Sequence, residues 1–562
     1  MSPYRKKILF RLQNSKNLLL FTENSQETAR HHKTICLPKV ISNQSVGTMK
    51  PFSLSDFKHM EVCDLLFLKK DEYVIPQQLV KGEAGEFVRI TDMTNPKALP
   101  VDPTFPFNQN LQLFLSGRKL LLDEISFSLE EIHNHYLHGY VDYRQGVIFD
   151  GKRLYCCRCG NKDAVFFASF HCARCKKKCW YCRKCIMMGR VSQCTPLIIW
   201  TGPTPHFSFQ KSLKWQGTLS PSQKDASIKI KEAVRERKEL LVWAVCGAGK
   251  TEMLFEGIEE AIQSGKRTAI ATPRTDVVLE LTPRFQQVFP DIPIASLYGG
   301  SEDRHRYSPL VIATTHQLLR FHEAFDCLII DEVDAFPYSA DEMLQTAAEL
   351  ARKKNGSLIF LTATPKEVWQ AECYRGKRNC VILPARFHRH PLPIPSFVWC
   401  GNWREKVKKG RIPSKILQWV KSRLVSGKQA LIFFPHIELM EQALPYFQKM
   451  DGRIEAVHSE DPNRKEKVQA MRTGNIPILL TTTILERGVT FPNIDVAVVG
   501  AEDDTFTESA LVQIAGRVGR SPQFPTGDIT FFHYGITRAM IRSRNQLLRM
   551  NRQARMKGLI DS

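Results

Sequence analysis

The residues best suited to chemistry in this 562-residue chain lie in four short motifs, found in a fixed order from residue 247 onwards. They are Gly247-Ala248-Gly249-Lys250-Thr251, Asp331-Glu332-Val333-Asp334, Thr362-Ala363-Thr364 and the run from Gln513 to Arg520. Glycines between a strand and a helix allow a tight turn whose backbone N–H groups, together with the helix dipole, bind an anion. In such a turn Lys250 reaches the β- and γ-phosphates of a nucleotide and Thr251 offers its hydroxyl to Mg²⁺. The first motif therefore predicts an ATP site.

The neighbours of this turn are expected to contact ATP as well. The usual eight-residue phosphate-binding pattern begins with glycine, and Ala244 stands at that position here. The predicted contacts from the turn are Cys246, Gly247, Ala248, Gly249, Lys250, Thr251 and Glu252. Upstream, the amide of Gln223 could pair with adenine, or Gln223 could be a surface residue of the first helix, and the sequence leaves both open.

Two carboxylates follow a fully apolar run, Cys327 to Ile330, which reads as a buried strand. Asp331 is predicted to hold Mg²⁺ through water, and Glu332 to polarise the attacking water. A solvated acidic turn would not explain the apolar strand in front of it. An ATPase is therefore the favoured interpretation.

The last motif supplies cations for the same reaction. Arg517 and Arg520 are three residues apart, which brings them near one face of a helix. Planar guanidinium groups suit the oxygens of a transferring γ-phosphoryl group. We therefore predict both as catalytic, with Gln513 and Gly488 as further ATP contacts.

Nine of the sixteen cysteines lie between Cys156 and Cys194, and such clustering indicates metal before disulfides. Two pairs spaced as in zinc ribbons predict one zinc site: Cys156, Cys159, Cys172 and Cys175. A second set, Cys179, Cys182, Cys185 and Cys194, could complete another site and would leave Cys157 spare. The pairing could also be nested or crossed, and an iron–sulfur cluster is the runner-up. Interleaved basic and aromatic residues, such as Lys178 and Trp180, could contact nucleic acid or merely cover the metal core.

The net charge of +22 and the pI of about 9.4 favour an anionic polymer or surface as partner. A hydrophobic share of 43% is ample for packed cores. No apolar run is long enough to span a bilayer, and the N-terminus lacks a convincing cleavage site. We therefore expect a cytoplasmic protein that could associate peripherally with a membrane.

Strands alternating with helices must position the motifs. The first set of expected strands is Leu240–Ala244, Thr268–Ala271, Leu310–Thr315, Cys327–Ile330 and Leu358–Thr362. The second set is Ala430–Phe434, Ile454–Val457, Ile478–Thr481, Val496–Val499 and Ile529–Phe532. This alternation predicts an α/β fold of two parallel-sheet lobes.

Ahead of the lobes, Leu111, Phe114 and Leu115 have the spacing of one helix face, and Ser128 with Glu131 could form a capping box. The expected order is a region of unknown role (1–105), a helical segment (106–150), a cysteine-rich zinc module (151–200), lobe 1 (217–385), a linker (386–410), lobe 2 (411–540) and a basic C-terminal helix (541–562).

Over about residues 217–535 the motifs resemble those of superfamily 2 helicases of the DEAD/DEAH kind. The matching segments are AVCGAGKTE, ATPRTD, IATTHQLL, DEVD, TAT, IFFP, TTTILERGVTFP and QIAGRVGR. DEVD differs from both DEAD and DEAH, but its Asp334 still allows coupling to the TAT segment. The resemblance implies two RecA-like lobes, and it places Thr272, Arg274, Thr315, His316 and Thr482 near the nucleic-acid track.

From about residue 107 onwards the chain also resembles the late competence protein ComFA family, through Ser126-Phe127-Ser128, Tyr155 to Asn161, Cys182 to Arg190 and the motor motifs. That resemblance implies an ATP-driven motor that brings single-stranded DNA into the cytosol during transformation, with a zinc site aiding activity. It also implies a membrane DNA-uptake channel and a phosphoribosyltransferase-like companion as partners. One alternative is a replication-restart helicase like PriA, although there the cysteine module is inserted within the motor region. The other is a zinc-dependent DNA-binding assembly factor with a vestigial ATPase.

Overall fold

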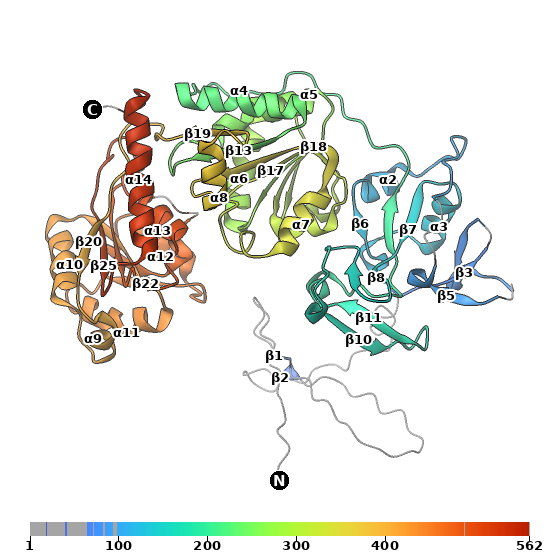
Figure 1. Ribbon diagram of the computed structural model, residues 1–562, viewed down its shortest axis with the longest axis horizontal. Coiled ribbons are helices and arrows are strands. Elements are labelled where there is room, and N and C mark those ends of the chain that lie inside the picture. The colour runs from blue at the N-terminus through green and yellow to red at the C-terminus, as the bar shows by residue number, and fades with distance from the viewer. Residues whose placement is uncertain are drawn as a thin grey trace, which may run out of the picture. The chain divides into compact units, whose positions relative to one another are not determined.

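The computed structural model describes residues 64–70, 72–82, 85–93, 98–487, 489 and 491–560, together with the backbone of two short strands, β1 (Leu18–Leu19) and β2 (Val40–Ile41). These two strands pair antiparallel within one compact unit, Met1–Glu61. The second unit, Val62–Ser562, carries every motif described above (Figure 1). Among the described residues, no helix combines the length and hydropathy needed to cross a bilayer.

Lobe 1 is built on a seven-stranded parallel sheet in the order β15-β16-β14-β17-β18-β13-β19. Its strands are β13 (Glu239–Ala244), β14 (Thr268–Thr272), β15 (Ile294–Leu297), β16 (Leu310–Thr314), β17 (Phe325–Ile330), β18 (Arg352–Thr362) and β19 (Cys380–Leu383). Its helices are α4 (Pro221–Glu236), α5 (Phe255–Gln263), α6 (Thr275–Val288), α7 (Glu342–Ala351) and α8 (Glu367–Tyr374). Helices α4, α5 and α6 share one core cluster, and α7 packs into another. Because both faces are covered, the central strands are almost entirely apolar.

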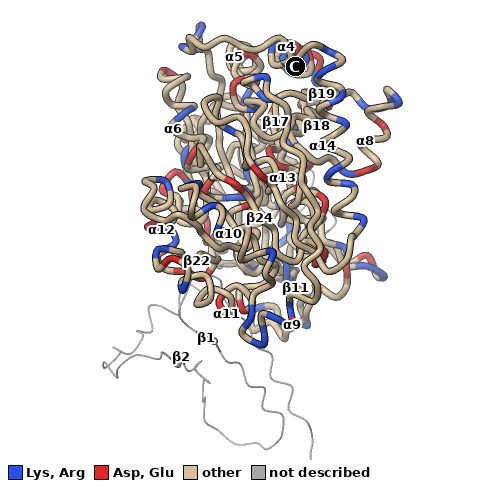
Figure 2. Tube along the Cα trace, turned by 90° about the vertical axis from the view of Figure 1, so that its left-hand side faces the viewer, with Lys and Arg blue, Asp and Glu red and all other residues tan. Residues whose placement is uncertain are grey.

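Lobe 2 has a six-stranded parallel sheet in the order β20-β25-β24-β21-β23-β22. Its strands are β20 (Ser396–Trp399), β21 (Gln429–Phe433), β22 (Glu455–Val457), β23 (Ile478–Thr481), β24 (Ile494–Val499) and β25 (Ile529–His533). Its helices are α9 (Trp403–Lys408), α10 (Ser414–Ser426), α11 (Ile437–Gln448), α12 (Arg464–Arg472), α13 (Glu508–Ala515) and α14 (Arg538–Met556). Figure 2 shows basic residues in blue along α9 and α14.

The two parallel-sheet lobes predicted from the sequence are confirmed. The expected linker is wrong in its extent, because β20 lies within residues 386–410 and pairs with β25. Lobe 2 therefore begins before residue 411.

Two helices precede the cysteines, α2 (Gln109–Leu115) and α3 (Leu129–Leu137), and Leu111, Phe114 and Leu115 are buried as expected. Ser128 caps α3 by accepting a hydrogen bond from the Glu131 N–H at 3.2 Å. The Glu131 carboxylate instead accepts from the Asn108 amide at 2.5 Å. Asn108 caps α2, so this bond joins the starts of the two helices.

Segment 106–150 is not only helical, because it also forms β6 (Lys119–Leu120), β7 (Val141–Arg144) and β8 (Val147–Phe149). Strands β6 and β7 flank β12 (Leu197–Trp200) in an antiparallel sheet, and β12 comes after the cysteines. The chain between β8 and β12 forms three more strands, β9 (Leu154–Cys156), β10 (Phe167–His171) and β11 (Lys178–Cys182). The cysteine region is therefore an excursion from this sheet.

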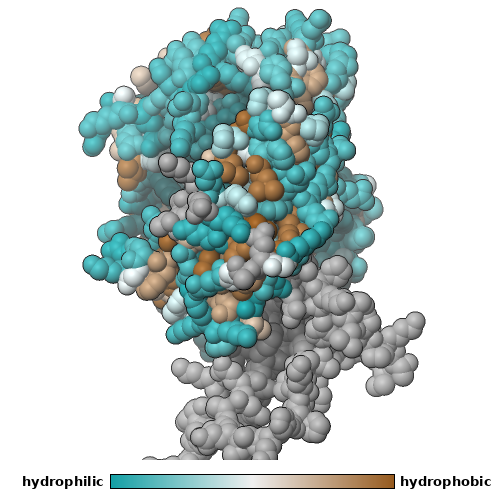
Figure 3. Space-filling model, turned by 90° about the vertical axis from the view of Figure 1, so that its right-hand side faces the viewer, coloured by the Kyte–Doolittle hydropathy of each residue, from teal (hydrophilic) through white to brown (hydrophobic). Residues whose placement is uncertain are grey.

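Residues 64–93, to which the sequence assigned no role, belong with the cysteine region. They form a small antiparallel sheet of β3 (Leu66–Lys69), β4 (Val74–Pro76) and β5 (Phe87–Arg89). The buried Asp64 carboxylate accepts hydrogen bonds from Ser192 at 3.1 Å and Thr195 at 2.8 Å. Figure 3 shows the face on the right-hand side of Figure 1. This face is largely hydrophilic, with hydrophobic residues gathered near its middle.

Candidate nucleotide pocket and metal sites

The glycine-rich turn leaves β13 at Ala244 and leads through a short 3-10 turn, Glu252–Leu254, into α5. Gly247 and Gly249 have φ angles of +83° and +72°, in the left-handed region that favours glycine. A Cβ at Gly249 would lie 2.3 Å from the Gln223 amide nitrogen. The turn therefore requires glycine for both backbone and space.

Gln223 is almost fully buried and holds this turn. Its amide donates to the carbonyls of Ala248 at 2.9 Å and Gly249 at 3.2 Å, and its carbonyl accepts from the Ser220 N–H at 2.9 Å. The surface alternative for Gln223 is thereby excluded. Contact with adenine stays a prediction.

The carboxylates of the second motif lie at the end of β17, beside the lysine of the turn. Burial raises the pKa of Asp331 to about 6, and the Lys250 ammonium opposes part of that rise. Glu332 has a left-handed backbone with φ +55°, and its N–H donates to the Asp331 carboxylate at 2.9 Å. The chain is thus turned so that two half-buried acidic groups lie together, with Asp331 close enough to the Lys250 ammonium to interact with it electrostatically.

Asp334 joins four segments. It accepts hydrogen bonds from Thr362 at 2.7 Å, from Thr364 at 2.6 Å and from Ser509 of lobe 2 at 2.7 Å, and it pairs with Arg487. Burial alone would raise the pKa of Asp334, but Arg487 and the hydroxyl donors hold it well below its usual range. The predicted coupling of Asp334 to the TAT segment is confirmed, and it extends into lobe 2.

The last motif packs directly on the glycine-rich turn. Gln513 accepts a hydrogen bond from the Cys246 thiol at 3.0 Å, and a Cβ at Gly516 would lie 2.5 Å from the Cys246 Cβ. Arg517 is 1% exposed and donates through Nε to the Glu486 carbonyl at 3.0 Å. Its Nη1 and Nη2 have no hydrogen-bond partner among the described residues. A buried guanidinium with two free NH2 groups suits a planar array of anionic oxygens, such as a terminal phosphate.

Eight cysteines form two groups of four whose sulfurs all lie within 4.8 Å of one another. The groups are Cys156, Cys159, Cys182 and Cys185, and Cys172, Cys175, Cys179 and Cys194. This corrects the expected grouping of Cys156 and Cys159 with Cys172 and Cys175. The two sites are interleaved along the chain, and Cys157 is the spare residue, as predicted.

The strand register explains this interleaving. Strand β11 carries Cys179 and Cys182, and residues three apart on a strand point to opposite faces. One thiol therefore joins each site, with the β10–β11 hairpin between the two.

The geometry of both groups fits a metal ion. Four thiolates about 2.3 Å from a central Zn²⁺ would be about 3.8 Å apart. The Sγ atoms of Cys156 and Cys185 are 3.7 Å apart, and those of Cys172 and Cys194 are 3.9 Å apart. All ligands but Cys175 are buried.

Comparisons with known proteins match three parts of this chain. A family model described as the competence protein ComFA N-terminal domain matches residues 101–199. Models described as the type III restriction enzyme res subunit and the helicase conserved C-terminal domain match residues 216–367 and 413–522. The competence protein ComFA of Bacillus subtilis (strain 168) is 47% identical over 456 residues, which cover 81% of this chain and 98% of that protein.

This chain belongs to the ComFA family.

A second family member, from Streptococcus pneumoniae, is 43% identical over 67% of this chain and 86% of its own length. Among solved structures, the DEAD-box helicase Mss116 bound to ssRNA and UDP-BeF matches with a TM-score of 0.44 and 18% identity, covering 56% of this chain and 70% of that one. The helicase-type domains make this ComFA-family chain an enzyme of the ATPase/helicase type, which implies ATP as its nucleotide.

The residues expected along a nucleic-acid track differ in their surroundings. Thr272 and Thr315 are fully buried, and their hydroxyls have no partner among the described residues. His316 is exposed and Thr482 is half-buried. Arg274 pairs with Asp276 at 2.7 Å. Gly488, the predicted ATP contact, lies outside the described residues.

One residue of the pocket was missed by the sequence analysis. Arg386 follows lobe 1, is 2% exposed, and donates to the Val518 carbonyl at 2.8 Å and, more weakly, to the Gly516 carbonyl at 3.4 Å. Its Cγ is 3.5 Å from where a Gly247 Cβ would lie. It therefore fixes the arginine motif against the phosphate-binding turn. No motif marks it, and its only sequence signal is its place at the end of lobe 1.

Proposed function

We propose that this protein is an ATP-driven motor that moves single-stranded DNA into the cytosol during competence. The observation that carries the proposal is Arg517, a buried guanidinium whose two NH2 groups have no hydrogen-bond partner in the described part of the chain, in a motif that contacts the phosphate-binding turn. The relatives' printed name, competence protein, supports the role in DNA uptake. The net charge of +22 fits a polyanionic substrate.

In this mechanism ATP binds between the lobes. Lys250 and the N–H groups of the turn bind the phosphates, while Thr251 and Asp331 would hold Mg²⁺, which neutralises phosphate charge when bound. Glu332 orients and polarises the attacking water. Arg517 and Arg520 stabilise the charge that develops on the γ-phosphoryl oxygens.

Asp334 links the nucleotide pocket to movement of the two lobes. It contacts the TAT segment, Ser509 and Arg487 together, so a change at the phosphates alters contacts in both lobes. Opening after hydrolysis would then shift the grip on one DNA strand. We place the motor in the cytoplasm at the inner face of the membrane, with a DNA-uptake channel and a phosphoribosyltransferase-like protein as partners. We assign Zn²⁺ to the two thiol sites.

The test is ATP turnover of the metal-replete protein alone and with single-stranded DNA, duplex DNA or RNA. Lys250→Ala is the blank, Arg517→Lys keeps the charge but alters the planar donor geometry, and Lys408→Ala removes an exposed charge on α9 as a control. We expect stimulation by single-stranded DNA, lost in Lys250→Ala, at least tenfold lower in Arg517→Lys and unchanged in Lys408→Ala. Turnover equal to the blank would leave a metal-bearing DNA-binding protein instead. Stimulation by duplex DNA alone would favour a replication-restart helicase.

A further inference from the structure

Helix α14 lies beyond the last matched family model, which ends at residue 522. It follows the final strand of lobe 2 and packs against α13. Three of its side chains make polar, ionic or cation–π contacts with lobe 1, and all three of these contacts involve the TAT segment or α8, the helix that follows it.

The central contact is buried. Gln546 is 5% exposed, and its amide donates to the Ala363 carbonyl at 2.7 Å. The same carbonyl accepts from the Trp243 indole N–H at 3.1 Å. Ala363 is the middle residue of the TAT segment, and Trp243 lies on the strand that leads into the phosphate-binding turn. One carbonyl therefore joins that strand, the TAT segment and α14.

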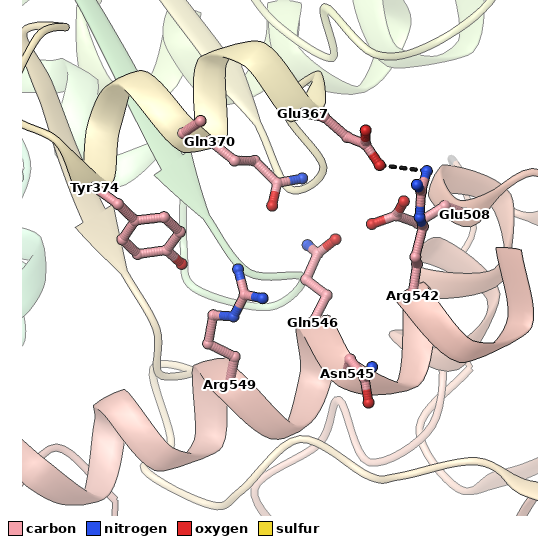
Figure 4. A pocket seen from close by; sticks show the side chains of 9 residues that line it. Glu367, Gln370, Tyr374, Glu508, Arg542, Asn545, Gln546 and Arg549 are labelled. Atoms are coloured by element: carbon pink, nitrogen blue, oxygen red, sulfur yellow. Dashed lines mark ion pairs between the residues drawn. The ribbon is translucent and has the colours of Figure 1, made fainter. Parts of the chain in front are cut away.

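The other two contacts lie on either side of Gln546. Arg542 pairs with Glu367 at the start of α8, and the Arg549 guanidinium lies 5.5 Å from the centre of the Tyr374 ring at the end of α8. Positions 542, 546 and 549 are spaced i, i+4 and i+7, so they share one helix face. Figure 4 shows these side chains facing those of α8 around a pocket. The volume of this cavity is about 370 Å³.

We infer that this face of α14 is an interlobe clasp that holds the TAT segment and α8 against lobe 2 when the lobes close, with Gln546 as its positioning residue. The clasp comprises Arg542, Gln546 and Arg549 with their partners Glu367, Ala363 and Tyr374. Thr362 and Thr364 bind Asp334, so a TAT segment fixed from its other side by Gln546 transmits closure to the catalytic carboxylates. The inference rests on the proposed function, in which ATP drives closure.

The exposure of each contact decides how it can be tested. The Arg542 and Glu367 side chains are 50% and 62% exposed, so their pairing adds little to the stability of the fold. Reversing one charge replaces attraction by repulsion across the lobes without creating a cavity. Arg542→Glu is the more repulsive of the two reversals, because Glu508 lines the same cavity and interacts with both positions. Reversing both charges restores the pair in the opposite sense.

The first experiment compares Glu367→Arg, Arg542→Glu and the double variant. Hydrogen exchange of residues 363–374 and 538–556 is measured with and without ADP–BeF3, followed by DNA-stimulated turnover. We expect each single variant to lose most of the nucleotide-dependent protection and to lower stimulated turnover roughly threefold to tenfold. The double variant should recover at least half of both. Single variants that match the wild type, or a double variant no better than the worse single one, would overturn the clasp.

The second experiment separates positioning from folding. Gln546→Leu should lower the stimulated kcat about tenfold while the KM for ATP and the melting temperature stay near wild type. Asn545→Ala is the matched control, because Asn545 directly precedes Gln546 on α14 and lines the same cavity. An equal loss in both variants, or a changed KM with unchanged kcat, would contradict the role given to Gln546. Exchange protection is read without a polymer, so a wild type that DNA fails to stimulate would refute the motor and still test the clasp.

Discussion

At the scale of single residues, Asp334 is the group on which both lobes depend. It takes a guanidinium and three hydroxyl donors at one carboxylate, and the paired Arg487 side chain is only 3% exposed. Asp334→Asn would remove the nearest counter-charge of Arg487 and leave it with the longer ion pairs to Glu486 at 3.4 Å and Glu332 at 3.5 Å. Breaking a buried ion pair costs up to about 3–5 kcal/mol in comparable sites. We expect ATP turnover to fall more than tenfold. Ser509→Ala removes one neutral donor and should cost no more than about fivefold. Steady-state turnover decides, and equal effects would show that the charge is not essential.

His133 makes the fold around helix α3 sensitive to acid. Burial lowers the pKa of His133 to about 4, so the unfolded chain binds its proton more readily between that value and the usual 6.5. Stability is therefore lost as the pH falls from 6.5 towards 4. The melting temperature should drop between about pH 7 and about pH 5, and it should drop less in His133→Phe. The exposed His206→Ala is the control and should follow the wild type. Parallel curves for all three proteins would exclude His133 as the cause.

At the scale of elements, the interleaved thiol sites make a prediction about metal content. Cys156→Ser with Cys182→Ser damages one site twice, so one ion per chain should remain. Cys156→Ser with Cys172→Ser damages both sites, so no ion should remain. Sequential grouping of the cysteines predicts the reverse for these two variants. Cys157→Ser should keep both ions, and elemental analysis of the purified proteins measures all three.

The elements that could be predicted from the sequence are those buried on both faces. The strands before Asp331 and before the glycine-rich turn are apolar runs, and the sequence predicts both correctly. The three missed strands of the lobes, β15, β19 and β20, all lie at sheet edges. An edge strand has one neighbour and is less enclosed, so β20 includes exposed positions and lacks a clear apolar pattern.

The candidate site also divides into features that the sequence predicts and features that it does not. Spacing predicted the phosphate-binding turn, the carboxylates and the arginines, because each motif is local in the chain. The thiol pairing, Arg386 and the Gln546 contact depend on segments that meet only in the fold. Gln546, for example, is 183 residues away from the carbonyl that it binds.

At the scale of the whole molecule, the excess of 22 positive charges should govern binding of DNA. Each phosphate contact with a single strand contributes a slope of about −0.7 in log affinity against log salt. If about five phosphates are bound, raising salt fourfold should weaken binding roughly 100-fold. Fluorescence anisotropy of a labelled single strand measures this, with an uncharged-backbone analogue as control. Affinity independent of salt would show that the basic surface does not bind the strand.

The antiparallel sheet of β6, β12 and β7, which precedes the lobes, determines how the metal region connects to the rest of the protein. Arg144 at the end of β7 and Leu197 at the start of β12 are direct antiparallel partners, so the chain leaves and returns at the same point. Two residues can close such a pair as a hairpin turn. A shortened chain joined by Asn-Gly across that point would preserve the register of the remaining sheet. The stretch 145–196 is nevertheless not independent of the lobes, because its buried cysteines share a hydrophobic core with lobe 1 side chains such as Leu344 and Ala347. Deleting the metal region would therefore uncover apolar side chains of lobe 1, and a lineage that keeps the motor is expected to keep a folded module on that surface.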